Sequence, residues 1–204
     1  MKKILTVVAV IFMTTALSAQ TKIGFRAGVG LSELRFNPVK LNGLSIATDP
    51  SDAIDFHTAI VLNLQIPGFL FLQPELQFNT ITSKFYVTQS SYGQTKLSYT
   101  RTSLQVPLLV GFNIGFLKFN AGPVFNLTSS DRTSVNHLGV KINTKKVPIG
   151  YQLGAGIRLG NMTIEARYAS VMEKSKYTFT HKGSSKTVTP KDDYQLLFSV
   201  GFLF

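Results

Sequence analysis

The segment KIGFRAGVGLS, residues 22–32, decides the fold because its apolar and polar residues alternate without a break. The polar or small residues take the even positions, and the odd positions hold the apolar residues Ile23, Phe25, Ala27, Val29 and Leu31. Successive side chains of a β-strand point to opposite faces. This period of two therefore predicts a strand with one apolar and one polar face.

The same alternation recurs in seven further segments: 54–66, 70–79, 103–112, 117–127, 149–159, 162–169 and 194–204. Short and long connections between them alternate. The short ones carry turn chemistry at Pro67-Gly68, Ile114-Gly115 and Gly160-Asn161, and the long polar ones are expected to be loops at about 33–53, 80–98, 128–147 and 170–192. An even number of strands of roughly ten residues with this arrangement is typical of an outer-membrane protein. We predict an all-β fold, an eight-stranded antiparallel up-and-down transmembrane β-barrel.

The composition supports a membrane protein over a cytoplasmic enzyme. Of 204 residues, 44% are hydrophobic and only 15% are charged, whereas an ordinary soluble domain has about 25% charged residues. The chain contains no cysteine, which excludes a disulfide scaffold, a thiolate metal site and a cysteine nucleophile. We expect no cofactor and no metal site.

The first residues have the pattern of a secretory signal peptide. Lys2 and Lys3 precede an apolar run, and small residues follow at Ala16, Ser18 and Ala19. The run is shorter than the ~20 residues that span a bilayer as a helix. We therefore expect residues 1–19 to be removed, leaving residues 20–204 as the barrel domain.

The volume of the barrel decides which face points outward. An eight-stranded barrel has room only for side chains in its lumen, so the bulky apolar face is expected to contact lipid. The polar face would then line the lumen with a network formed by Arg26, Asp55, His57, Glu75, Lys118, Arg158, Glu165 and Arg167. The alternative is a soluble lipocalin-like ligand-binding barrel, in which the apolar face would be internal.

Those lumenal charges favour a closed barrel. An unpaired buried ion costs several kcal/mol, so acids and bases are expected to pair into a plug. A small-solute or ion pore is the alternative. Asp55 and His57 share one face, but no spacing in the sequence supplies a nucleophile with a base and an orienting third group. We expect no enzymatic activity.

The order of several stretches resembles a known family. These stretches are IGFRAGVGLS at 23–32, GFLFLQPELQF at 68–78, LQVPLLVGF at 104–112, FNAGPVF at 119–125, LGAGIRLG at 153–160 and IEARYA at 164–169. Together they resemble the PorT-like outer-membrane β-barrel family of bacteroidete bacteria over residues 20–204. The ending QLLFSVGFLF, with terminal Phe204, also looks like the C-terminal strand that assembly machinery recognises in outer-membrane barrels. The resemblance implies a barrel inserted in the outer membrane. One namesake of that family is associated with the type IX secretion system, whereas most members have no assigned activity. We therefore expect either a structural and interaction role or an accessory role in protein secretion. The resemblance supplies no catalytic residues.

The long loops concentrate positive charge. Thirteen bases and five acids give them a net charge of +8. Two clusters stand out: Lys141, Lys145 and Lys146, and then Lys174, Lys176, Lys182 and Lys186. We expect these loops to be extracellular, with the tight turns and both termini periplasmic. Contact with anionic glycolipid or an acidic partner is one interpretation, and plainly solvated loops are the other. Nucleic acid is not an expected partner, because an exported chain does not meet it.

Overall fold

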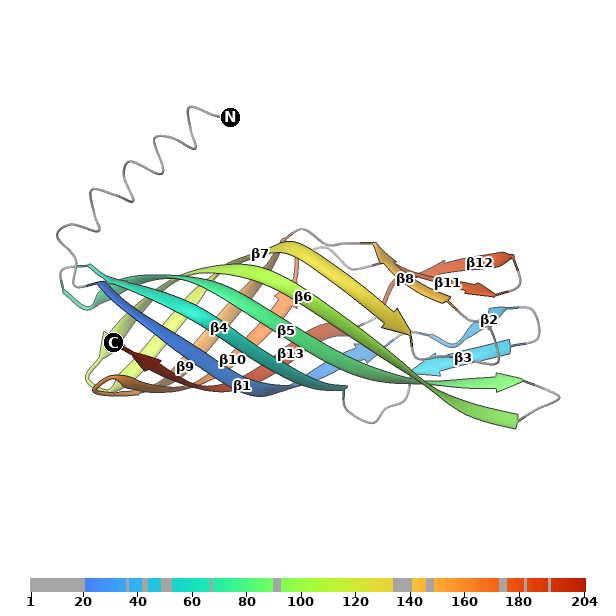
Figure 1. Cartoon of the computed structure of the whole chain (residues 1–204), viewed down its shortest axis with the longest axis horizontal. Helices are drawn as coiled ribbons and strands as arrows, with labels where there is room; N and C mark the ends of the chain where they lie inside the picture. The colour runs from blue at the N-terminus through green and yellow to red at the C-terminus, as the bar shows by residue number, and fades with distance from the viewer. Residues whose placement is uncertain are drawn as a thin grey trace, which may run out of the picture.

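Eight long strands close into a barrel (Figure 1). The computed structural model describes residues 21–35, 37–41, 44–48, 53–66, 68–89, 93–133, 141–145, 149–172, 176–181, 183–190 and 192–204. In this part of the chain the barrel strands are β1 Thr21–Arg35, β4 Ala53–Gln65, β5 Leu70–Gln89, β6 Gly93–Ile114, β7 Leu117–Thr133, β9 Ile149–Leu159, β10 Met162–Val171 and β13 Asp192–Leu203. All neighbours are antiparallel, and β1 pairs with β13 to close the sheet. The predicted fold class is confirmed.

Tight turns lie at one end of the barrel. Gly68, Gly115 and Gly160 have φ angles of 99°, 59° and 62°, a backbone region that favours glycine. These residues connect β4 to β5, β6 to β7 and β9 to β10. The C-terminus lies at this same end, where the Phe204 amide donates to the Ile23 carbonyl at 2.7 Å.

The barrel is apolar outside and polar inside. Phe25 is 59% exposed on the outer wall, whereas Arg26, the next residue, is 3% exposed and faces the lumen. The same alternation holds along β4 and β10. This sidedness rules out the lipocalin-like alternative, because a soluble barrel would turn its apolar face inward. Among the described residues, no helix is long and apolar enough to cross a membrane.

Aromatic side chains mark both ends of the lipid-facing wall. At the end remote from the turns, Tyr151, Tyr168 and Tyr194 form a row across β9, β10 and β13, with ring centroids 6.2 and 5.7 Å apart. At the turn end, Phe25 and Phe204 meet edge to face at 6.2 Å. Tyrosine favours the membrane–water interface, and outer-membrane barrels carry aromatic side chains near both interfaces, so the two groups agree with an apolar slab between them.

Two strands run far beyond the tyrosine row. β5 and β6 have 20 and 22 residues, about twice the length that a tilted membrane strand needs. The inward face of β5 changes character along its length: Glu75 and Gln77 are buried in the lumen, but further along Phe85 and Val87 are buried. Beyond the bilayer the outer face of a strand contacts water instead of lipid. The apolar residues of this part of β5 therefore occupy the inward face.

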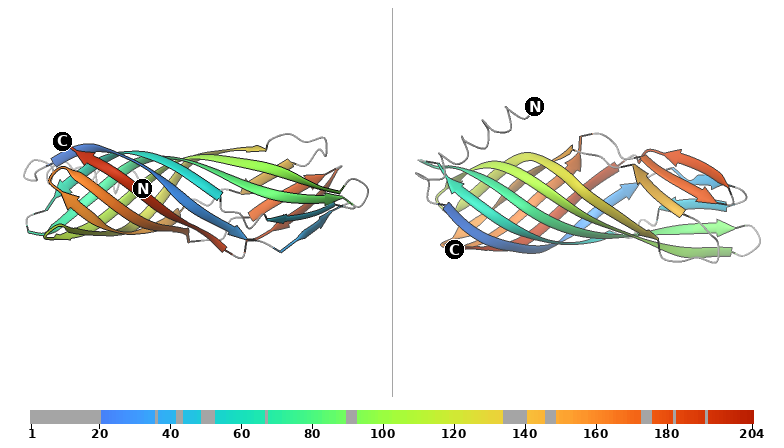
Figure 2. Two further views of the ribbon diagram at one scale, coloured as in Figure 1. Left: turned by 90° about the horizontal axis from the view of Figure 1, so that it is seen from below. Right: turned by 45° about the horizontal axis from the view of Figure 1, so that its top comes forward.

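Beyond the barrel, these extensions and five short strands form a second unit, which we name the head (Figure 2). The short strands are β2 Val39–Leu41, β3 Leu44–Thr48, β8 Lys141–Lys145, β11 Lys176–His181 and β12 Ser184–Val188. β2 and β3 extend the barrel sheet beside β5, while β8, β11 and β12 make a separate three-stranded sheet. Between the sheets lies a hydrophobic core formed by Val39, Ile46, Phe85, Val87, Tyr99, Tyr177 and Phe179.

The head corrects the expectation that all four long connections are loops. Segments of each connection pair with one another in the described residues. Three of these connections, 33–53, 80–98 and 170–192, each contribute two residues to this core, too few to form a strand pattern by themselves. The core exists because segments distant in sequence bring those residues together.

Candidate functional site

A charged network fills the centre of the lumen, and Glu75 is one of its two acceptors. Arg167 binds this carboxylate in a bidentate manner, from Nη1 at 3.0 Å and from Nη2 at 2.8 Å. Arg26 donates to the same carboxylate from the other side. All three side chains are almost completely buried. Glu75 therefore joins β1, β5 and β10 across the interior.

Glu165 is the second acceptor. Arg167 donates to its Oε2 from Nε at 2.8 Å and from Nη2 at 2.5 Å, and Lys118 donates to its Oε1. Lys118 also donates to Gln73 at 2.9 Å, and its ammonium lies 5.1 Å from the centre of the Phe71 ring. Arg167 thus bridges both carboxylates. Charge-assisted and bidentate bonds of this kind are the stronger class of hydrogen bond.

Amide side chains extend the network along the barrel. Gln77 accepts from Arg26 at 2.9 Å and donates to Asn79 at 2.7 Å. From there the chain continues to Gln105 at 2.8 Å and on to Asn126 at 2.7 Å. The prediction from sequence omitted these amides. Their signal was present, because Gln73, Glu75, Gln77 and Asn79 recur every second residue on one face of β5.

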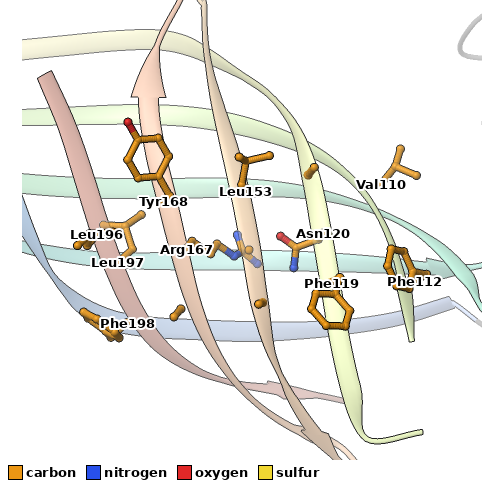
Figure 3. A pocket seen from close by; sticks show the side chains of 14 residues that line it. Val110, Phe112, Phe119, Asn120, Leu153, Arg167, Tyr168, Leu196, Leu197 and Phe198 are labelled. Atoms are coloured by element: carbon orange, nitrogen blue, oxygen red, sulfur yellow. The ribbon is translucent and has the colours of Figure 1, made fainter. Parts of the chain in front are cut away.

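The register of β9 against β10 leaves space for the Arg167 side chain. Gly154 of β9 stands directly opposite Arg167 of β10. A Cβ atom at Gly154 would lie 2.9 Å from Arg167 Cγ and 2.5 Å from Asn120 Oδ1. Glycine at this position lets the long side chain cross the lumen. Figure 3 looks at the same wall, where Arg167 and Asn120 help to line a hollow of about 490 Å³ whose other lining is largely apolar and includes Phe112, Leu153 and Phe198.

Three of the eight predicted lumenal residues lie apart from this network. Asp55 and His57 are each 0% exposed on the inner face of β4, but neither carboxylate oxygen and neither ring nitrogen has a hydrogen-bond partner. Arg158 differs from the prediction: it lies half-buried at the turn end and donates to the Gly160 carbonyl at 3.2 Å and to Gln65 at 3.4 Å. The structure brings together Arg26, Glu75, Lys118, Glu165 and Arg167. Among the described residues, no group of three or more His, Cys, Asp or Glu side chains could hold a metal ion.

Two acidic side chains between barrel and head contact side chains of neighbouring strands. Asp131 lies 4.0 Å from Arg101 across β6 and β7, and Glu33 accepts from the Tyr194 hydroxyl. Burial in the head core, reinforced by the charge of Asp193, raises the pKa of Tyr177 above its ordinary value.

Four of the predicted surface lysines lie in described strands. Lys141 and Lys145 belong to β8, Lys176 to β11 and Lys186 to β12, and the last two are exposed. Lys146, Lys174 and Lys182 fall outside the described residues, as does the predicted signal peptide at 1–19.

Comparison with known proteins gives a family and a set of similar folds. Residues 18–170 match the family model described as the outer membrane protein beta-barrel domain. Among solved structures, the chain is similar to the neisserial surface protein A, with 13% identity and a TM-score of 0.46 over 89% of this chain and 97% of that one. It is also similar to the Escherichia coli outer membrane protease OmpT, with 12% identity and a TM-score of 0.39 over 91% and 96% of the two chains. The Yersinia pestis outer membrane protein Ail has 11% identity and a TM-score of 0.33 over 91% and 100%. No curated protein sequence matches the chain.

Proposed function

Because the chain belongs to the outer membrane protein beta-barrel domain family, we propose that it is a closed, non-enzymatic barrel that carries its head above the outer membrane for contact with surface glycolipid. Outer-membrane location follows from the family, and the apolar wall with its aromatic ends agrees with it. The role of the head and the direction in which it points are what we propose. We place the head outside the cell, and the tight turns and both termini in the periplasm.

The observation that carries the closed state is the lumenal network. Five charged side chains from four strands meet at hydrogen-bond distance in the middle of the barrel, and amides continue from them along the wall. An eight-stranded barrel has no space beside such a set for an aqueous path. This arrangement supports a structural plug over the alternative of a small-solute or ion pore.

Burial supports the non-enzymatic part of the proposal. Asp55 and His57, the pair weighed as catalytic, are completely buried in the wall of the lumen. A general base must reach the proton that it abstracts in a bound substrate. No substrate reaches these groups unless the barrel opens.

Planar-bilayer recording tests the closed lumen. The purified full-length protein, reconstituted beside a porin as a positive control, is expected to give no steady conductance. A steady, large conductance would show that the network gates or lines a pore.

Protease treatment of intact cells tests the direction of insertion. Cleavage near Lys145 and Lys182 with Gly68 spared is the expected result. Cleavage at the Pro67-Gly68 turn with the head spared would mean inverted topology, and the proposed surface contact would fall with it.

The resemblance to the PorT-like family adds one further element to this proposal, an accessory role in protein secretion. The family match supports the outer-membrane barrel class and does not reach that subfamily. Mild crosslinking in outer membranes followed by purification of the full chain tests it. Recovery of secretion components in stoichiometric amounts is expected, and recovery of lipid alone would remove this element.

A further inference from the structure

The outer wall over β5 and β6 changes from apolar to polar at one level. On β5 the outward residues nearer the turns are all apolar, and Phe78 is the last of them, with Leu104 of β6 directly opposite. From there both strands run on past the barrel (Figure 1). Most of the described side chains that follow on this outward face carry a hydroxyl group, and we name them the hydroxyl band: Thr80, Thr82, Tyr86 and Thr88 on β5, Ser98, Thr100 and Thr102 on β6, and Thr128 and Ser130 on β7.

Strand register aligns the hydroxyl band in rows. Thr80 pairs with Thr102, which pairs in turn with Ser130, and Thr82 pairs with Thr100. The hydroxyls of Thr82 and Thr100 are 3.3 Å apart, whereas within the described part of the chain no hydrogen bond engages the side chains of Thr80, Thr102 and Ser130. A hydroxyl offers one donor and two acceptor positions. The band can therefore both donate to and accept from a polar partner.

An apolar hollow of about 660 Å³ adjoins the hydroxyl band on the same wall. Ala27 of β1 and Thr58 of β4, two small outward residues, are paired within it, and Thr58 pairs with Phe78. Phe25 lines the hollow toward the turns, and Phe78 and Leu104 line it at the other side. The hollow therefore ends where the hydroxyl band begins.

The lipid-facing wall indicates what covers the hydroxyl band. Acyl chains cover the apolar wall in a membrane, so the headgroup of a lipid that lies in the hollow meets the residues that follow Phe78 and Leu104 on the same strands. Sugar hydroxyls both donate and accept, as the side chains of the band do. A phosphate group instead favours cationic donors, and Lys84 is the one cation among the described outward side chains of β5 and β6 beyond Phe78 and Leu104.

The length of the polar wall also favours a saccharide. Lys84 is exposed on the outward face of β5, six residues beyond Phe78. At ~3.3 Å per residue this separation is about 20 Å along the strand, or roughly 15 Å along the membrane normal at a strand tilt of about 40°. The headgroup layer on each side of a phospholipid bilayer is only about 5–8 Å thick. A headgroup that contacts both Thr80 and Lys84 is therefore longer than that of a phospholipid.

We propose that the outer wall over β4, β5 and β6 binds one glycolipid of the outer leaflet, with an acyl chain in the hollow and the saccharide headgroup along the hydroxyl band. This inference rests on the proposed function and specifies its contact surface. Thr80 and Thr102 bind the sugar nearest the membrane. The Thr82–Thr100 pair and the Lys84 ammonium donate to sugar oxygens farther out.

Binding of lipid to the purified full-length protein in detergent micelles, titrated by native mass spectrometry, tests this proposal. The probe is digalactosyl diacylglycerol, whose headgroup is a neutral disaccharide, and the comparison is phosphatidylglycerol with the same acyl chains. The unaltered protein should bind one molecule of the galactolipid and prefer it to phosphatidylglycerol. One hydrogen bond corresponds to about fivefold in affinity. The double variant Thr80→Val, Thr102→Val should therefore bind the galactolipid roughly 25-fold more weakly and phosphatidylglycerol as before.

The matched control removes two threonine hydroxyls from the other sheet of the head. Thr178 of β11 and Thr187 of β12 are paired there, with their hydroxyls 2.9 Å apart. The double variant Thr178→Val, Thr187→Val should keep the affinity of the unaltered protein. Valine retains the branched shape of threonine, and heat-dependent gel mobility verifies that the barrel is folded in every variant. If a double variant does not fold, the single change Thr102→Val, with an expected loss of about fivefold, decides the question.

A second pair of variants tests the hollow. Ala27→Phe places a large side chain in it and should weaken binding of both lipids, because the acyl chain loses its place. Ala121→Phe is the control, since Ala121 lines the separate hollow of about 490 Å³. This control should bind both lipids as the unaltered protein does. Equal affinities in the two variants would remove the hollow from the site.

The outcomes separate this wall from the wider proposal. Equal affinity of the unaltered protein for the two lipids would mean ordinary boundary lipid and would overturn the choice of ligand. Equal loss in the two threonine double variants would overturn the assignment to the hydroxyl band. If the unaltered protein prefers the galactolipid and the Thr80, Thr102 variant does so equally, the contact lies elsewhere and the proposed function stands. Failure of the unaltered protein to bind the galactolipid would remove glycolipid contact altogether, whereas the closed lumen depends on the conductance test.

Discussion

Replacing Glu75 by Gln tests the lumenal network at the point where two arginines share one carboxylate. Arg167 binds it at 2.8 and 3.0 Å, and Arg26 contacts it from the opposite side. At 2.8 Å and an effective dielectric constant of 20, two unit charges attract by about 6 kcal/mol before desolvation is subtracted. Breaking a buried pair by removal of one partner costs about 3–5 kcal/mol net. We expect the free energy of unfolding to fall by that amount.

Asp55→Asn is the matched control, because Asp55 is an equally buried lumenal carboxylate that has no hydrogen-bond partner. Removing its charge breaks no bond, so the free energy of unfolding should change by less than about 1 kcal/mol or rise. Denaturant titration in one detergent, followed by heat-dependent gel mobility, measures both variants. The reasoning is refuted if Glu75→Gln costs less than about 1 kcal/mol, or if Asp55→Asn is the more damaging change.

Three further changes test the head and the packing of the lumen. Phe179→Ala empties the centre of the head core and should cost about 3–5 kcal/mol there; limited proteolysis should cut the head faster than that of the unaltered protein, while the heat-dependent mobility of the barrel stays unchanged. Burial raises the pKa of Tyr177, so the unfolded chain loses this proton first, and the head should lose stability as pH rises above about 10. Tyr177→Phe should remove that part of the alkaline dependence, and an identical pH profile would contradict it. Gly154→Val places side-chain atoms against Arg167 and should cost about 1–3 kcal/mol, whereas Ala155→Val on the lipid-facing wall should be nearly neutral in the same denaturant titration.

The strands and their sidedness could be predicted from the sequence because both depend on local alternation. Phe25 and Arg26 are neighbours with opposite environments, and parity alone assigns one to lipid and the other to the lumen. The limited width of an eight-stranded barrel then fixes which parity is inside. This argument needs no knowledge of which residues pair across the lumen.

Partners within the lumen were decided by tertiary structure. Sequence parity put eight ionisable residues inside, but it could not show that Arg167 bridges Glu75 and Glu165 while Asp55 and His57 stay unbonded. Contacts across the lumen depend on the height of each residue along the barrel axis. That height follows from strand tilt and register, which involve all eight strands together.

The sequence by itself determined an outer-membrane barrel, because each strand separately carries the alternation of apolar and polar residues that a lipid-facing wall and a narrow lumen require. Only the tertiary structure decided that the connections form a head and that Lys145 stands opposite Lys176. The head core uses only two residues from each of three connections, such as Ile46 and Phe179. No such segment buries enough surface to specify its own structure. The head forms because the closed barrel holds the ends of these connections close together, which lowers the entropic cost of pairing them.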